Sequence, residues 1–395
     1  MSCQTWMFYS IGTIQMDSVL RVKIPASITL DPAAPDLQEI IAGLPASSGI
    51  YALAASGHAP HLASSANLRR RLARLLTPSR ARGGSLDALR EKVASVDCWP
   101  TGSRLETALL MYQLARQYFP GEYLKRLRLR TPWFACLRRR DPFPRLEILN
   151  RISPAGDSTF GPFLSRDAAD AYAQQVLQLF QIRRCAEILT PHPDHPGCIY
   201  GEMNQCLRPC QCAVSAEEYA TESARVAEFL ATNGRSALAS LSVARERASA
   251  EMDFEQAAQI HKRIEKVGSA CAFRDPVIAN ATEFNGVALT RGTGVLQVRL
   301  WPMLAGLWQE PICLDFSTEE SQPKSLDRQI RELLAESLAN PRTRGRRAEE
   351  MGIFSRWYYS SWRDGHWFPF ERLTDLNYRR LVRQISSFQK PQQSV

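Results

Sequence analysis

Residues 185–212 read CAEILTPHPDHPGCIYGEMNQCLRPCQC, and they separate two differently patterned parts of the chain. Five of the ten cysteines of the 395-residue sequence fall within this stretch. The N-terminus lacks the positively charged start of a secretory signal, so we expect a cytoplasmic protein. In a reducing compartment, clustered cysteines bind a metal or take part in redox chemistry more often than they form disulfides. The stretch is therefore a candidate metal centre.

The overall composition is that of an ordinary globular protein, with 45% hydrophobic and 23% charged residues. No apolar run reaches the roughly 18 residues that a membrane span requires, so we expect no membrane partner. The formal net charge is +9, which favours a polyanionic partner such as nucleic acid. A basic enzyme without such a partner would show the same excess, so charge alone leaves both possibilities open.

The sequence before the cysteines alternates strand and helix patterns. SSGIYALAASG predicts a strand, and APHLASS after it predicts the partner strand of a hairpin. RLETALLMYQLARQYFP predicts a helix that ends at Pro120. Between them, ANLRRRLARLL places leucines on one helix face and arginines over the rest. This cationic face either contacts phosphates or is merely solvated, and its members are Arg69, Arg70, Arg71 and Arg74.

Extended segments precede the cysteines and return near the C-terminus. Residues 131–165 contain three strand-like pieces, and the helix pattern over 166–184 takes Asp167 as its N-cap. Residues 276–316 predict a small antiparallel sheet, followed by a helix over 326–339. The last stretch, FSRWYYSSWRDGHWFPF, interleaves basic and aromatic residues, which suits single-stranded nucleic acid and a small aromatic core equally well.

Long helices follow the cysteines directly. Ser215 and Glu218 match a capping box that opens a helix ending at Asn233. Residues 235–268 predict an αα-hairpin that turns near Asp253. A hairpin of this size is marginal alone, so its apolar face needs a partner protein or the rest of this chain.

Four blocks in the same order make this chain resemble UvrC, the nuclease subunit of the bacterial excinuclease, and its shorter relatives. GIY at 49–51 with ANLRRRL resembles a GIY-YIG nuclease domain, and FGPF at 160–163 resembles the segment before the family's cysteine region. The cysteines from Cys185 to Cys210 resemble that region, and MDFEQAA at 252–258 resembles the UVR motif through which UvrC binds UvrB.

The resemblance implies an α+β, multi-domain fold. Its parts would be an N-terminal extension (1–44), a GIY-YIG nuclease-like α/β domain (45–130), a strand-rich connector with the cysteine cluster (131–214), a UVR-type helical hairpin (215–270) and a small β-rich α+β C-terminal domain with a basic and aromatic tail (271–395).

A GIY-YIG site cuts a phosphodiester with one divalent metal held by a carboxylate. By resemblance, its first tyrosine is Tyr51 and its phosphate-binding arginine is Arg71. The second tyrosine falls on His61, which can still act as a general base. The metal-binding glutamate falls on Met111, and methionine cannot replace a carboxylate on Mg²⁺. We expect a degenerate nuclease site, unless Glu106 serves as a substitute ligand for Mg²⁺ or Mn²⁺.

The four spaced cysteines read Cys185-x12-Cys198-x7-Cys206-x3-Cys210. Four thiolates suit either a structural zinc or an iron–sulfur cluster, and only the last pair has the tight spacing of a zinc site. Since UvrC cysteines at this spacing bind a [4Fe–4S] cluster, the resemblance implies that cofactor, with Zn²⁺ as the alternative. Unmetallated buried thiols are the third possibility, and Cys212 is left over.

The resemblance to the UVR motif implies a UvrB-like partner. Phe254, with Glu255 and Ala258, is the candidate contact, and packing within the chain is the alternative. The leading prediction is a UvrC-like, DNA-binding protein of nucleotide excision repair with a degenerate nuclease site. One alternative is an active metal-dependent endonuclease that makes a single incision on the 3′ side of damaged DNA. Another is a regulatory binding protein that uses the UVR hairpin outside repair.

Overall fold

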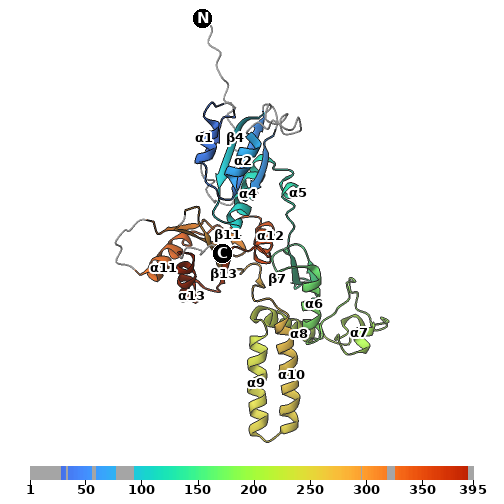
Figure 1. Cartoon of the computed structure of the whole chain (residues 1–395). Coiled ribbons are helices and arrows are strands. Elements are labelled where there is room, and N and C mark those ends of the chain that lie inside the picture. Colours follow the sequence, from blue (N-terminus) through green and yellow to red (C-terminus); the bar gives the residue numbers. More distant parts are fainter. Residues whose placement is uncertain are drawn as a thin grey trace.

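The computed structural model describes residues 28–32, 34–55, 59–76, 93–294, 296–317 and 325–389. Three antiparallel sheets with helices packed on them make up these ranges, which confirms the expected mixed α+β class. Figure 1 shows the N-terminal sheet at one end, the C-terminal sheet beside the middle and a helical hairpin projecting at the other end. No helix within the described ranges is both long and apolar enough to cross a membrane.

The N-terminal sheet has the strand order β1-β4-β2-β3, with α1 and α2 on one face and α4 on the other. Along β2, Tyr51 and Leu53 pack on the α2 side while Ile50 and Ala52 pack on the α4 side, because side chains alternate along a strand. The predicted hairpin and both predicted helices are present. Strand β1 pairs with β4, so the sheet begins upstream of residue 45. The elements are β1 (Ile28–Leu30), α1 (Leu37–Gly43), β2 (Gly49–Ala55), β3 (His61–Ser65), α2 (Leu68–Leu76), β4 (Val93–Pro100), α4 (Arg104–Tyr118) and α5 (Tyr123–Leu127).

The middle sheet has the order β6-β5-β7-β8 and packs against α6. Three of its strands fall on the predicted extended pieces, while β8 comes from beyond the helical hairpin. The N-cap of α6 is Ser165 and not the predicted Asp167, because Ser165 Oγ accepts a hydrogen bond from Ala168 N at 3.1 Å. Asp167 lies in the first turn, where a carboxylate still favours the helix N-terminus. The elements are β5 (Trp133–Leu137), β6 (Leu146–Leu149), β7 (Ser158–Phe163), α6 (Arg166–Leu177) and β8 (Ala279–Asn280).

The helices after the cysteine loop confirm the predicted pattern. Ser215 and Glu218 exchange both hydrogen bonds of a capping box at the start of α8. Asn233 ends that helix in the left-handed conformation, with φ of 52°. Asp253 caps α10 at the tip of the α9–α10 hairpin, which projects away from the sheets (Figure 1). The elements are α7 (Ile199–Glu202), η1 (Pro209–Gln211), α8 (Ala216–Thr232), α9 (Arg235–Ala250) and α10 (Phe254–Ala272).

The C-terminal sheet has the order β11-β10-β9-β13 with β12 also paired to β10, which confirms the small antiparallel sheet. The aromatic stretch at 354–370 supplies the C-terminal part of α12 and the edge strand β13. Phe354 and Trp357 are fully buried and Trp367 is 8% exposed. These three rings therefore build the core, while Tyr358 and Trp362 of the same stretch stay partly exposed. The elements are β9 (Gly286–Arg291), β10 (Gln297–Leu304), β11 (Leu307–Trp308), β12 (Ile312–Asp315), α11 (Leu326–Ser337), α12 (Arg347–Tyr358), β13 (Gly365–Pro369), η2 (Leu373–Asp375) and α13 (Tyr378–Gln389).

The C-terminal unit packs back onto α4 and α5 through buried polar contacts. The hydroxyls of Tyr112 and Tyr123 both donate to the Glu349 carboxylate, at 2.6 and 2.9 Å. Arg299 on β10 forms an ion pair with Glu106 on α4. One hydrophobic core runs from α4 through the middle sheet to α12. The three sheet-containing regions are thus joined by shared packing as well as by the chain.

Candidate functional site

Tyr51, Arg71 and His61 lie on the same face of the N-terminal sheet. Arg71 Nε donates a hydrogen bond to the Tyr51 hydroxyl at 3.0 Å, and the Arg71 guanidinium lies 5.8 Å from the centre of the Tyr51 ring. Tyr51 is only 1% exposed, so its ring belongs to the core while its hydroxyl orients Arg71. His61 stands opposite Leu53 on the edge strand β3, which puts its exposed side chain on the Tyr51 face.

Glu106 lies on the other side of this sheet. It shares one stripe of α4 with Leu110 and Leu114, which pack against the face opposite Tyr51. Its carboxylate is 3% exposed and is engaged by Arg299 from the C-terminal sheet. Burial raises the pKa of the Glu106 carboxyl, and the Arg299 guanidinium opposes that rise. The structure therefore does not bring Glu106 to the other predicted site residues.

Met111, at the position that the resemblance gives to the metal-binding carboxylate, is part of an apolar contact. It packs against the cluster formed by Ile50, Trp99, Leu110 and Leu114. A thioether in such a cluster supplies dispersion contacts and no hard oxygen ligand.

The predicted arginine face of α2 is solvent-facing. Arg69, Arg70 and Arg74 are exposed, and Arg71 is half-buried beside Tyr51. Arg69 Nε donates to the carbonyl oxygen of Leu44 at 2.6 Å, which ties α2 to the end of α1. The guanidinium of Arg71 is held by the Tyr51 hydroxyl of the sheet, which orients it for a phosphate.

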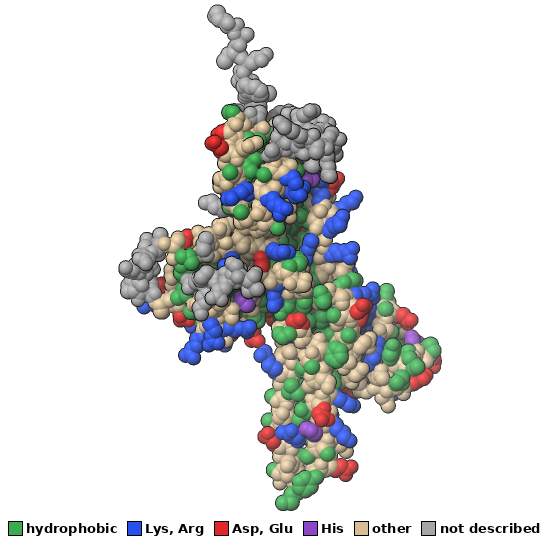
Figure 2. All heavy atoms as spheres, in the orientation of Figure 1, with side chains coloured by type: hydrophobic (Ala, Val, Ile, Leu, Met, Phe, Trp, Pro, Cys, Tyr) green, Lys and Arg blue, Asp and Glu red, His purple; other side chains and the backbone are tan. Residues whose placement is uncertain are grey.

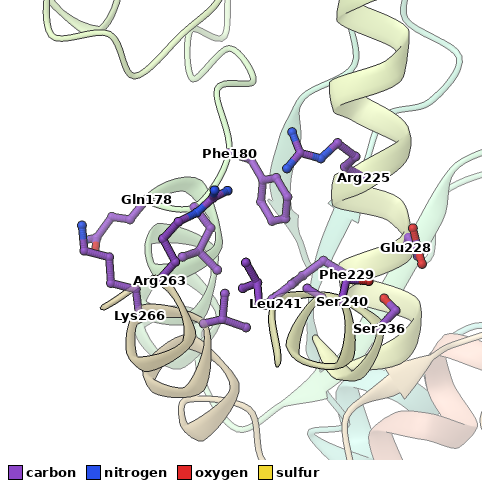
Figure 3. Close-up of a pocket in the computed structure, with 13 residues that line it drawn as sticks. Gln178, Phe180, Arg225, Glu228, Phe229, Ser236, Ser240, Leu241, Arg263 and Lys266 are labelled. Carbon is purple, nitrogen blue, oxygen red and sulfur yellow. The ribbon is translucent and has the colours of Figure 1, made fainter. Parts of the chain in front are cut away.

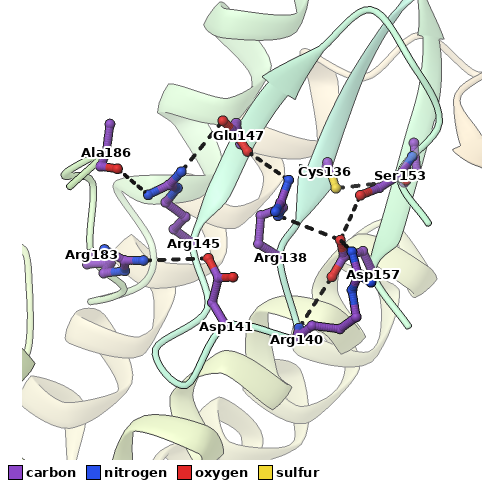
Figure 4. A network of polar contacts seen from close by, with 11 residues as sticks. Cys136, Arg138, Arg140, Asp141, Arg145, Glu147, Ser153, Asp157, Arg183 and Ala186 are labelled. Carbon is purple, nitrogen blue, oxygen red and sulfur yellow. Dashed lines mark hydrogen bonds and ion pairs between the residues drawn. The ribbon is translucent and has the colours of Figure 1, made fainter. Parts of the chain in front are cut away.

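An arginine network fastens the start of the cysteine loop to the middle sheet (Figure 4). Arg145 donates to the Ala186 carbonyl oxygen at 2.6 Å. Arg183 forms an ion pair with Asp141 at 3.6 Å and donates to the Glu187 carbonyl oxygen at 2.7 Å. The first residues of the loop are therefore positioned by side chains of the sheet rather than by regular secondary structure.

Gln181 fastens the second half of the loop. Its side-chain amide donates to the Asn204 carbonyl oxygen at 2.6 Å, and its own carbonyl oxygen accepts from Leu207 N at 3.0 Å. Its backbone N–H donates to Glu222 on α8 at 2.8 Å. One residue thus links α6, the loop and α8.

The four predicted cysteines lie in this loop, where Cys206 and Cys210 are buried, Cys185 is partly buried and Cys198 is exposed. Burial raises the pKa of the Cys206 thiol, and the neighbouring thiols of Cys185, Cys198 and Cys210 raise it further. Arg208 N donates to Cys206 Sγ at 3.4 Å. Cys212, the spare cysteine, is exposed.

Four soft sulfur atoms with an N–H donor aimed at one of them are the donor type that zinc and iron–sulfur clusters use. In the part of the chain that the structure describes, however, no three Cys, His, Asp or Glu side chains stand close enough to hold a metal ion. The donor chemistry fits a metal centre, while the loop conformation seen here is not a closed ligand shell.

The tip of the α9–α10 hairpin exposes apolar side chains. Phe254 is 69% exposed and Met252 beside it is 76% exposed. Glu255 and Ala258 are exposed on the first turns of the same helix, α10. Packing within the chain therefore does not cover the predicted partner contact.

The base of the hairpin contains a cleft of about 380 Å³ between the end of α6 and helices α8, α9 and α10 (Figure 3). Phe180 points into it, with Arg225 and Arg263 on opposite sides of the ring. Lys266 also lies at its rim. The sequence pattern gave no indication of this cleft, because its walls come from four helices.

A second basic run, KRLRLR at 125–130, was not among the predicted DNA-binding residues. Its signal is the alternation of leucine and arginine, which indicates one packed side and one cationic side. Only the α2 arginines were predicted to contact phosphates, because they lie beside the nuclease-like motif.

Comparison with known proteins finds one matching family model and a set of similar curated proteins. Residues 132–229 match the family described as UvrC/Cho excinuclease, middle domain, which runs from β5 through the cysteine loop into α8. The UvrABC system protein C of Limosilactobacillus fermentum is 28% identical over 230 residues, which are 58% of this chain and 37% of that protein. The chain is therefore similar to UvrC excinuclease proteins, and residues 132–229 carry the match to their middle domain.

Other UvrC proteins agree over different extents. The UvrABC system protein C of Nitratidesulfovibrio vulgaris is 27% identical over 282 residues, covering 69% of this chain and 40% of its own length. That of Alcanivorax borkumensis is 28% identical over 177 residues, covering 45% and 29%. These matches span well under half the length of the curated relatives. No solved structure matches the chain.

Proposed function

We propose that this UvrC-like chain is a DNA-binding protein of nucleotide excision repair whose nuclease-like site no longer cuts. The observation that carries the proposal is that neither candidate metal-ligand position offers a free carboxylate, since Met111 packs in an apolar cluster and Glu106 is paired with Arg299. Tyr51 and Arg71 remain hydrogen-bonded on one face of the sheet, while Glu106 is buried against Arg299 on the other. An arginine held in place can bind a phosphate without any metal. Hydrolysis in a GIY-YIG-like site also needs a carboxylate-bound divalent cation.

An incision assay with purified full-length protein tests the proposal. The substrate is a damaged DNA duplex, with Mg²⁺ or Mn²⁺, in the presence and absence of a UvrB-type protein. We expect duplex binding without strand cleavage. Robust metal-dependent cutting that disappears in Glu106→Gln would contradict the proposal and favour the single-incision endonuclease. Glu106→Gln keeps the shape of the buried side chain, so lost cutting could not be blamed on a cavity.

The hairpin tip is the proposed contact for a UvrB-type partner. An exposed phenylalanine at the start of α10 is costly in water and becomes favourable when a second apolar helix face covers it. In a pull-down with a UvrB-type protein, Phe254→Ala should lose most binding. Ile188→Ala is the matched control, because Ile188 is 95% exposed but lies in the cysteine loop. Binding by Phe254→Ala as strong as that by Ile188→Ala would show that the hairpin tip is not the contact.

The cysteine loop is proposed to hold a [4Fe–4S] cluster, with zinc as the alternative. Cys185, Cys198, Cys206 and Cys210 would be the ligands, and the bound group would link α6 to α8 through a loop that has little core of its own. Anaerobic purification followed by an absorption spectrum and metal analysis separates the two. A colourless protein with one tightly bound zinc would exclude the cluster.

A further inference from the structure

Residues 125–130 form a cationic edge that the nuclease-like motif does not include. Leu127 and Leu129 pack against the main hydrophobic core. Arg126, Arg128 and Arg130, which alternate with them, are exposed. This arrangement follows from the KRLRLR pattern, since the leucines take the inner side and leave the arginines to solvent.

Helix α12, more than 200 residues further along the chain, completes this edge. Arg356 on α12 donates to the Leu127 carbonyl oxygen at 3.1 Å. Gly352, one turn earlier, lies so close to the segment that a Cβ there would be 2.8 Å from the Arg130 carbonyl oxygen. The edge is therefore built by two distant segments that the tertiary fold holds together.

Tyr123 orients further cations at the same place. The guanidinium of Arg116 on α4 lies 5.8 Å from the centre of its ring, and that of Arg346 lies 5.9 Å from it. The Tyr123 hydroxyl donates to Glu349, which fixes the ring itself. We call the seven cations of this edge the arginine ridge, and they are Arg116, Lys125, Arg126, Arg128, Arg130, Arg346 and Arg356.

Most of the positive charge on the ridge is not neutralised. Arg126 pairs with Glu122 at 3.1 Å and Arg346 pairs with Glu349 at 3.2 Å. Lys125, Arg128 and Arg130 have no ion pair or side-chain hydrogen bond within the described ranges. Exposed cations without partners keep their full attraction for a polyanion, since no internal salt bridge has to be broken first.

The aromatic rings beneath the ridge are covered. Tyr112 is 1% exposed and Tyr123 is 6% exposed, so neither presents a face on which a base could stack. The ridge therefore suits the sugar–phosphate backbone rather than unpaired bases. Figure 2 shows Lys and Arg side chains gathered beside α5 and, in the same view, over α2, so both cationic regions face one side of the molecule.

We propose that the arginine ridge is a contact surface for the phosphate backbone of a DNA duplex that also reaches the α2 arginines. The proposal rests on the proposed DNA-binding function and names the surface that performs it. The ridge needs α12 as well as α5, so duplex binding depends on the C-terminal unit being packed against α4.

The test uses full-length protein in which Lys125, Arg128 and Arg130 are all changed to glutamine. Glutamine keeps a polar side chain with part of the aliphatic stem and removes three charges that have no ion pair in the described structure, so we expect the fold to be retained. Arg379→Gln, Arg380→Gln and Arg383→Gln on α13 together form the control, because they remove the same charge from another exposed surface. Binding to a short fluorescent duplex is measured by anisotropy across a salt series.

The ridge variant should bind the duplex at least about 10-fold more weakly. The slope of the logarithm of the association constant against the logarithm of the salt concentration should fall in magnitude by about 2.7, which is about 0.9 for each lost phosphate contact. The control variant should stay close to the original protein. Equal losses in both variants would reduce the ridge to a general electrostatic effect and overturn the proposal.

Two further outcomes separate the ridge from the function. If the unaltered protein binds no duplex, the DNA-binding function itself fails. If it binds normally and the ridge variant matches it in affinity and slope, only the ridge proposal fails. Loss of binding to anionic lipid vesicles in the ridge variant, with duplex binding unchanged, would assign the surface to a membrane instead.

Discussion

The Tyr51–Arg71 face and the cysteine loop are built in opposite ways. The first sits on a regular sheet and helix, with Tyr51 buried and its hydroxyl fixed on Arg71. The second has hardly any regular structure between α6 and α8 and is positioned by side-chain hydrogen bonds from Arg145, Arg183 and Gln181. A packed scaffold keeps its shape without any bound group. A loop without a core depends on its polar anchors and on whatever its thiols bind.

Loss of one loop cysteine should give the largest effect. Cys206→Ser should abolish stoichiometric metal in the purified protein, because Cys206 is buried and belongs to the predicted ligand set. Cys212→Ser should keep the metal, since Cys212 is exposed and outside the predicted ligand set. Metal analysis and limited proteolysis of the loop measure both variants. Equal metal content in the two variants would show that Cys206 does not bind the metal and would contradict the proposed ligand set.

Glu106→Ala should cost about 3–5 kcal/mol of unfolding free energy, because it leaves Arg299 without its buried partner. Denaturant unfolding measures this loss. Converting the pair to Glu106→Leu with Arg299→Met should recover much of it, since an apolar pair leaves no unpaired charge. A stable Glu106→Ala protein would show that this carboxylate has no structural role, and would weaken the contrast drawn above.

Asp157 belongs to the network of Figure 4, and Asp157→Asn should cost about 1–3 kcal/mol at neutral pH. Burial alone would raise the pKa of Asp157, but hydrogen bonds from Ser153 and Arg140 bring it below its ordinary 3.8. A depressed carboxyl pKa gives stability that is present above 3.8 and lost as pH falls through the lower folded value. The difference between the two proteins in thermal unfolding should therefore shrink below that pH. A constant difference would exclude ionised Asp157 as the cause.

Tyr51→Phe should have the smallest effect, about 0.5–1.5 kcal/mol, because water can replace the hydroxyl beside the half-buried Arg71. Duplex affinity should fall only a few fold, since Arg71 keeps its charge but loses its fixed orientation. Thermal unfolding and anisotropy measure the two effects. A loss of affinity as large as that of Arg71→Ala would mean that Arg71 binds DNA only when the Tyr51 hydroxyl holds it.

Local signals in the sequence predicted the elements well. The capping box of Ser215, the cap of Asp253 and the β2–β3 hairpin all depend on residues a few positions apart, so pattern and propensity suffice. The misplaced cap at Asp167 is an error of two positions within the same local rule. The cysteine spacing and the order of the motifs likewise indicated the similarity to UvrC from sequence alone.

Tertiary structure decided which side chains face each other. Glu106 lies away from Tyr51 because α4 packs on the opposite face of the sheet. There its carboxylate pairs with Arg299, which lies 193 residues later in the chain. Trp357 and Trp367 became core because β9 and α4 lie against them. The arginine ridge exists because α12 docks on α5. The spacing of residues along the chain determines local helices, strands and caps. Which side chains contact each other depends on packing against distant segments, and no local pattern specifies that packing.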